Sequence, residues 1–182
     1  MRKIVILLCF FVLSGCEPSE GEKRASRTQA LVSMAEAFDL SDIDNVKALI
    51  NEGVYLETVV SEGETPLMKA VAQEKLAIAK TLIDAGANVN ARASMTSVLS
   101  HAIRAGNIDF VRLVLDAGAS PNNLVYVSEL QIAILNNRPK MVELLLKAGA
   151  DITDTNIKGQ TALELAKEEG FVDIVEMLEK HK

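Results

Sequence analysis

GETPLMKAVAQEKLAIAKTLIDAGANVN, residues 63–90, reads as one complete structural unit, and it decides the fold. Thr65 and Pro66 predict the start of a first helix, because proline has a suitable φ for the first turn and loses no hydrogen bond there. A second stripe of apolar residues at helical spacing begins at Leu76. Gly86 predicts the end of that helix, since a residue without Cβ adopts the left-handed conformation at little cost.

The unit returns along the chain. The leucine of the first helix and the glycine after the second stay 19 residues apart: 67 to 86, 99 to 118 and 130 to 149. The step from each glycine to the next leucine varies: 86 to 99, 118 to 130 and 149 to 163. Fixed helix pairs with variable connections indicate a solenoid, because packed helices resist insertions that surface loops tolerate. We expect Leu113 and Leu145 of the second helices to lie between stacked helices.

The recurring pattern resembles the ankyrin repeat, which has a period near 33, T-P-L-x-x-A, two helices and G-A-x-x-N. The matching first halves are Thr65-Pro66-Leu67 with Ala70, Ser97-Val98-Leu99 with Ala102, Ser128-Glu129-Leu130 with Ala133, and Thr161-Ala162-Leu163 with Ala166. The resemblance implies an all-α solenoid of about five helix-turn-helix repeats joined by hairpin-like loops. We expect the repeats at about 30–60, 61–91, 92–122, 123–154 and 155–182.

Two departures from the family pattern carry structural expectations. The family usually has a histidine two residues after the proline, where its ring bonds the neighbouring turn. Here that position holds Met68, Ser100, Gln131 and Glu164, which predicts a thinner network. The glycine of the family's loop becomes Met95 and Tyr126 in the middle repeats, which predicts irregular hairpins there.

The N-terminal residues read as a targeting segment rather than as part of the fold. A basic start is followed by an apolar run, Ile4 to Leu13, too short to span a membrane, and then by Ser14-Gly15-Cys16. This resembles the bacterial lipoprotein signal, in which the cysteine thiol receives diacylglycerol and becomes the new N-terminus. We therefore expect a signal peptide at 1–15, a lipidated Cys16 with a tether at 16–29, and the repeat domain at 30–182. The alternative is an ordinary signal peptide cut elsewhere, with Cys16 incidental.

The tether favours a location close to a membrane. Residues 17–29 are polar and carry charges of both signs, so a flexible chain of this length reaches on the order of 20 Å. Glu17 follows the cysteine, and it is not the aspartate that retains enteric-type lipoproteins in the inner membrane. We expect a palmitate-bearing, periplasm-facing protein of the cell envelope, on the outer rather than the inner membrane.

Composition and motifs argue against catalysis. After removal of the signal, no cysteine remains for a disulfide or a metal site apart from Cys16. The chain lacks G-x-S-x-G, a phosphate loop and H-E-x-x-H, and its two histidines lie far apart in sequence at His101 and His181. The net charge is −6, and −8 without Arg2 and Lys3, which argues against nucleic acid or anionic lipid as a ligand of the repeats. We expect no enzyme activity, no cofactor and no metal.

The function that remains is binding of another protein. The resemblance implies that this occurs through a concave surface built from hairpin tips and first helices. The apolar run Leu124 to Val127 is unusual for a hairpin tip, and with Met95 and Leu135 it would form an exposed patch. The predicted binding residues are Arg92, Met95, Arg104, Leu124, Val125, Tyr126, Val127 and Leu135. Two alternatives stay open: the loop folds under against Leu130, and the basic residues form an ordinary solvated helix face.

The expected function is that of a lipid-anchored, monomeric protein-binding module of the periplasm. Ankyrin-type lipoproteins that serve as immunity proteins are similar, and by that resemblance the chain would block a secreted antibacterial toxin. A structural or quality-control adaptor in the envelope is the alternative. The sequence does not separate these two uses.

Overall fold

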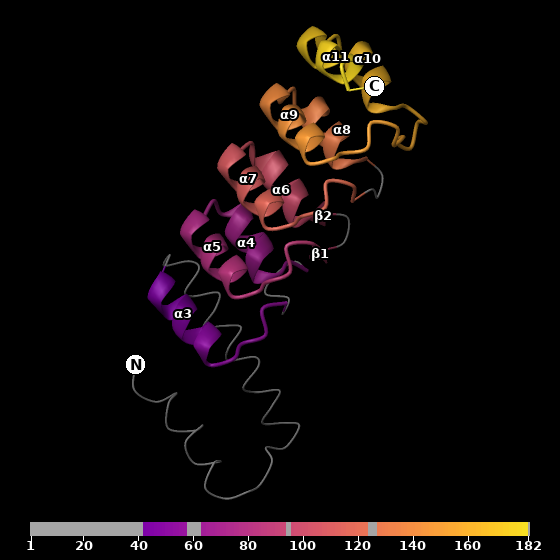
Figure 1. Ribbon diagram of the computed structural model, residues 1–182. Coiled ribbons are helices and arrows are strands. Elements are labelled where there is room, and N and C mark those ends of the chain that lie inside the picture. Colours follow the sequence, from indigo (N-terminus) through magenta and orange to yellow (C-terminus); the bar gives the residue numbers. More distant parts are fainter. Residues whose placement is uncertain (1–41, 58–62, 94–95, 124–126, 182) are drawn as a thin grey trace, which may run out of the picture.

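The computed structural model describes residues 42–57, 63–93, 96–123 and 127–181. Over these ranges helix α3 and the helix pairs α4/α5, α6/α7, α8/α9 and α10/α11 are stacked one after another, from indigo α3 to yellow α11 (Figure 1). The helices are α3 (Ile43–Asn51), α4 (Pro66–Ala72), α5 (Leu76–Asp84), α6 (Val98–Ala105), α7 (Ile108–Asp116), α8 (Glu129–Leu135), α9 (Pro139–Lys147), α10 (Ala162–Glu168) and α11 (Val172–Glu179). The predicted all-α solenoid is confirmed.

The helices form two rows. Helices α4, α6, α8 and α10 pack on one another in chain order, while α3 packs on α5, α7 on α9, and α9 on α11. Within each repeat the two helices pack together, as α4 with α5 and α8 with α9 do. Strands β1 (Arg92–Ala93) and β2 (Thr96–Ser97), and the loop before α10, lie on the first-helix side of the stack (Figure 1).

The first helices carry much of the core. In α8 every residue is buried except Leu135 at its end. The recurring leucines Leu67, Leu99 and Leu130 are almost fully buried, and each such side chain contributes about 1.5–3 kcal/mol by leaving water. Their counterpart in the last repeat, Leu163, is only half-buried, because no further repeat covers it.

Local side-chain chemistry explains where the helices begin. The Thr65 hydroxyl accepts a hydrogen bond from the Met68 N–H at 3.3 Å, with Pro66 in the first turn behind it. Asp42 and Asn107 cap α3 and α7 in the same way, by accepting backbone N–H groups. Each of these starts follows from the sequence, and each is confirmed.

The hairpin of the third repeat is more regular than the sequence predicts. Strands β1 (Arg92–Ala93) and β2 (Thr96–Ser97) pair antiparallel, with Arg92 opposite Ser97 and Ala93 opposite Thr96. The expectation of an irregular hairpin here was wrong, because the backbone ladder and the Thr96 hydroxyl, which donates to the Ala93 carbonyl at 3.0 Å, support the pairing. Met95 and Tyr126 themselves lie outside the described residues.

Asparagine side chains link the loops at the ends of successive second helices. The Asn90 amide donates to the Gly118 carbonyl at 3.1 Å and accepts from the Ser120 N–H at 2.7 Å. Asn122 makes the same pair of bonds one repeat later. These bonds hold neighbouring repeats in register where the chain leaves each second helix.

One packing expectation holds and one needs correction. Leu145 of α9 is fully buried, as predicted, but Leu113 of α7 is only half-buried. The buried stripe of α7 consists of Phe110, Val111 and Val114, so the large aromatic ring takes the interior place. Among the described residues, none of the helices has both the length and the apolar character needed to cross a bilayer.

Candidate functional site

Two positions three residues apart recur on one face of each first helix, the second of them exposed and the first half-buried or buried. From repeat two to repeat five these are Lys69/Ala72, His101/Arg104, Ile132/Leu135 and Leu165/Glu168. Because the first helices stack in order, the four pairs form one continuous column. We call this column, with the adjoining hairpin residues, the first-helix face.

The centre of the first-helix face is apolar. Leu135 is 49% exposed at the end of α8, while the Ile132 side chain below it is nearly buried. Ile157, in the loop before α10, is 77% exposed. Large apolar side chains that remain exposed, as Leu135 and Ile157 do, mark a surface that can bury area against a partner.

The neighbouring third repeat is basic. Arg92 on β1 and Arg104 on α6 are both exposed. Both guanidinium groups lie near enough to the Glu129 carboxylate to lower its pKa, and Arg104 also lowers the pKa of His101. The two arginines therefore lie around one buried acid, and Arg104 also lies close to His101.

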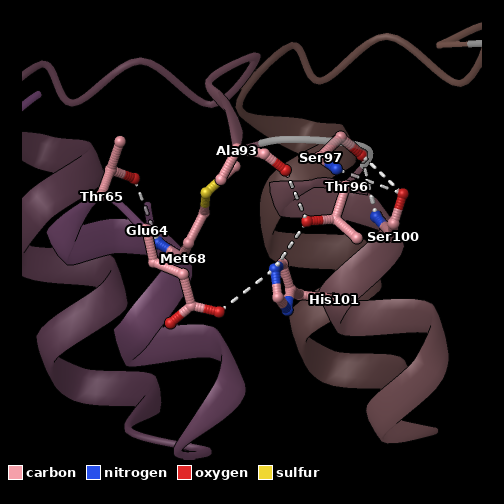
Figure 2. A network of polar contacts seen from close by, with 8 residues as sticks. All are labelled: Glu64, Thr65, Met68, Ala93, Thr96, Ser97, Ser100 and His101. Atoms are coloured by element: carbon pink, nitrogen blue, oxygen red, sulfur yellow. Dashed lines mark hydrogen bonds and ion pairs between the residues drawn. The ribbon is translucent and has the colours of Figure 1, made fainter. Parts of the chain in front are cut away.

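His101 is held by a chain of polar contacts at the base of the hairpin (Figure 2). Its Nε2 lies 3.2 Å from the Thr96 hydroxyl and 3.5 Å from a Glu64 carboxylate oxygen. Since the only hydroxyl proton of Thr96 goes to the Ala93 carbonyl, Nε2 carries the proton and donates. Burial lowers the pKa of His101, Glu64 opposes that effect, and Arg104 adds to it. His101 thus joins repeats two and three as a neutral donor.

Glu129 is a fully buried acid between repeats three and four. The Ser97 hydroxyl donates to its Oε1 at 2.5 Å, and the Ser100 hydroxyl donates to its Oε2 at 2.8 Å. Burial raises the pKa of Glu129, while the two serines and the two arginines lower it by smaller amounts. The sequence interpretation missed this residue. Its signal was a glutamate in the motif position that Pro66 holds in repeat two.

The position of the family's histidine still connects repeats, which corrects the expectation of a thinner network at two sites. Ser100 bonds Glu129, and the Gln131 amide donates to the Gln160 carbonyl at 2.9 Å in the following repeat. A polar side chain can replace the imidazole at these two sites because its partner in the next repeat lies within hydrogen-bond distance. For Ser100 that partner is the Glu129 carboxylate. The expectation holds at Met68, a buried thioether that reaches toward Ala93 (Figure 2).

The structure brings three of the predicted binding residues to one side. Arg92, Arg104 and Leu135 are all exposed there. Val127 is half-buried and packs against the core, so at this residue the chain follows the folded-under alternative. The remaining predictions, at Met95, Leu124, Val125, Tyr126 and Cys16, concern residues outside the described ranges. Within those ranges no cluster of three histidine, cysteine or acidic side chains is placed to hold a metal ion.

Comparison with known proteins identifies the repeat. The family model for ankyrin repeats in three copies matches at residues 6–93, 34–125 and 99–182. XBAT34 of Arabidopsis thaliana, which carries the name of an E3 ubiquitin-protein ligase, is 31% identical over 145 residues, covering 78% of this chain and 30% of its own length. YahD of Escherichia coli K12, which carries the name of an ankyrin repeat protein, is 28% identical over 185 residues, covering 78% of this chain and 92% of its own.

A third relative, the transient receptor potential channel pyrexia of Drosophila melanogaster, is 37% identical over 115 residues, 61% of this chain and 12% of that protein. The chain thus spans less than a third of the first plant relative and nearly all of the bacterial one. The ranges matched by the family model include all of the stacked helix pairs described above. The chain belongs to the ankyrin repeat family.

Proposed function

We propose that the chain binds another protein through its first-helix face, with repeats three and four at the centre of the contact. Ankyrin repeats are protein-binding modules, typically without catalytic activity. The observation that carries the proposal is Leu135, which is 49% exposed although the preceding residues of α8, Glu129 to Ile134, are all buried. Its neighbours Arg92 and Arg104 supply a charged rim beside the apolar centre.

The proposal includes the location and the use of this surface. Support for a lipid anchor at Cys16 comes from the basic start, the short apolar run and the small residues before the cysteine. Several acyl chains would give stable membrane attachment, since each buried CH₂ contributes about 0.8 kcal/mol. An envelope protein of this kind would neutralise a secreted toxin by covering its surface, or act as an adaptor for a resident periplasmic protein. The two uses share one binding surface and differ in the partner.

The anchor is tested by metabolic labelling of cells that express the full chain. Labelled palmitate is expected in the wild-type protein, and the Cys16→Ala chain is expected to be unlabelled and released from membranes. A wild-type chain that stays unlabelled contradicts the proposed anchor. It does not bear on the proposed binding surface.

The binding surface is tested with two matched leucine variants. Leu135 and Leu76 are similarly exposed, at 49% and 43%, but Leu76 belongs to the second-helix row. A partner captured from envelope extracts should lose about tenfold in affinity for the Leu135→Gln chain, about 1.4 kcal/mol, and little for the Leu76→Gln chain. Equal affinities of the two variants would mean that the first-helix face is not the contact. Sequencing of the captured partner separates a toxin from a resident envelope protein.

A further inference from the structure

The first-helix face changes charge along the stack. The outward position of the first helices holds Ala72 in repeat two, Arg104 in repeat three, Leu135 in repeat four and Glu168 in repeat five. Each of these side chains is exposed. From repeat three to repeat five the face therefore runs from basic through apolar to acidic, within a protein whose net charge is −6.

The basic end is available to a ligand. Neither Arg92 nor Arg104 forms an ion pair with another described residue, and Glu129, the acid whose pKa both arginines lower, is buried and bonded by serine hydroxyls. Burial raises the pKa of Glu129, and the two arginines lower it by smaller amounts. A guanidinium group that forms no ion pair within the described ranges favours a carboxylate from outside, which it can bind through two parallel hydrogen bonds.

The acidic end would reject the same carboxylate. Glu168 accepts a short hydrogen bond from the Gln160 amide, and Glu169 beside it is exposed. The neighbouring Lys167 is engaged elsewhere, with Glu179 of α11 at 2.9 Å, so it does not neutralise this end. An acidic group placed here would face like charges, which penalises the reversed arrangement of a ligand.

We infer that the first-helix face binds a segment of its partner protein in one orientation, with an acidic side chain over repeat three, an apolar side chain over Leu135 and a basic side chain over repeat five. This rests on the proposed function and adds the class of ligand and its direction. Packed helices lie about 10 Å apart, so Arg104 and Glu168, two repeats apart, are about 20 Å apart. An extended chain rises about 3.3 Å per residue, so its two charges should be about six residues apart.

A polyanion is a poor alternative occupant. A nucleic acid or an anionic membrane would place repeated negative charge along the whole face, including over Glu168 and Glu169. A protein segment can instead alternate its charges to match the gradient. The occupant is therefore a peptide segment of mixed charge rather than a uniformly acidic surface.

The test selects peptides from a random library on the immobilised full chain and then reverses charges one at a time. Arg104→Glu should weaken a selected peptide about tenfold at low salt, and reversal of the peptide's acidic residue should restore its affinity. Glu168→Arg should be compensated only by reversal of the peptide's basic residue. Each restored affinity identifies one residue of the peptide with one residue of the face. The test therefore shows which end of the peptide lies over which repeat, whether its backbone runs parallel or antiparallel to the stack.

Matched controls remove the effect of net charge. Arg112 on α7 and Glu176 on α11 are exposed on the second-helix row, so Arg112→Glu and Glu176→Arg change the charge equally and should leave affinity unchanged. Equal losses of affinity for Arg104→Glu and Arg112→Glu would overturn the inference. So would recovery of the affinity of the Glu168→Arg chain by reversal of the peptide's acidic residue. Failure to select any peptide would also overturn it, since a segment is the stated occupant. If peptides respond to Leu135→Gln but not to charge reversal, the proposed function stands and only the orientation fails.

Discussion

Glu129 shows how a single residue departs from what its motif predicts. In repeat four it holds the position of Pro66 in repeat two, at the first turn of a helix, where an acidic side chain ordinarily faces water. Here it is fully buried and bonded by Ser97 and Ser100 of the preceding repeat. The motif reveals the substitution but not the burial, because the serine donors lie about thirty residues away and come close only when repeats stack.

The pH dependence of folding should report this buried acid. Burial raises the pKa of Glu129 above its ordinary value of 4.5, so between 4.5 and the folded pKa the folded chain keeps a proton that the unfolded chain has released. Its contribution to stability is therefore greatest below pH 4.5 and declines as pH rises through the folded pKa. The Glu129→Gln chain lacks this decline, so its free energy of unfolding in urea, relative to wild type, should grow between pH 4.5 and pH 7.

Two further variants serve as comparisons for the Glu129→Gln measurement. Hydrogen bonds from Thr161 lower the pKa of the exposed Glu164, so Glu164→Gln should show the opposite trend, losing most relative to wild type above pH 4.5. Ser100→Ala removes one donor and leaves the buried carboxylate short of a hydrogen bond, which should cost about 1–3 kcal/mol at pH 7. A Glu129→Gln difference that stays constant with pH would contradict the account of this site.

At the scale of helices, the sequence predicts ends better than interiors. Thr65, Asn107 and Gly86 act through their own backbone neighbours, so local chemistry was enough to place them. The interior stripe of α7 was harder, because Phe110 and Leu113 are both apolar and only packing decides which is buried. The hairpin β1–β2 was misjudged for a related reason, since its ladder depends on paired backbone groups rather than on the residue at its tip.

Stability should follow the two kinds of helix surface. Leu145 of α9 is fully buried, whereas Leu135 of α8 is half exposed. Leu145→Ala should cost about 2–5 kcal/mol through lost burial and the cavity that remains. Leu135→Ala, at the surface, should cost much less. Urea melts monitored by circular dichroism that rank the two variants in the reverse order would contradict the stacking described here.

For the whole molecule, repetition made the fold predictable. A constant spacing between the recurring leucines and glycines identifies the helix pair, and stacking follows because one pair cannot bury its apolar face alone. The candidate site was less predictable. Arg92, Arg104 and Leu135 were found because they occupy outward positions of the repeat. The inward turn of Val127 and the links through Ser100 and Gln131 depend on contacts between repeats, which no single repeat encodes.

The most direct test of the binding face is hydrogen–deuterium exchange of the full chain with and without its captured partner. The account predicts slower exchange on binding in the β1–β2 hairpin, at the end of α6 around Arg104 and at the end of α8 around Leu135. Exchange in α5, α7 and α9, on the second-helix row, should stay unchanged. Protection confined to those second helices, or to residues 17–29, would contradict the claim that this protein acts through its first-helix face.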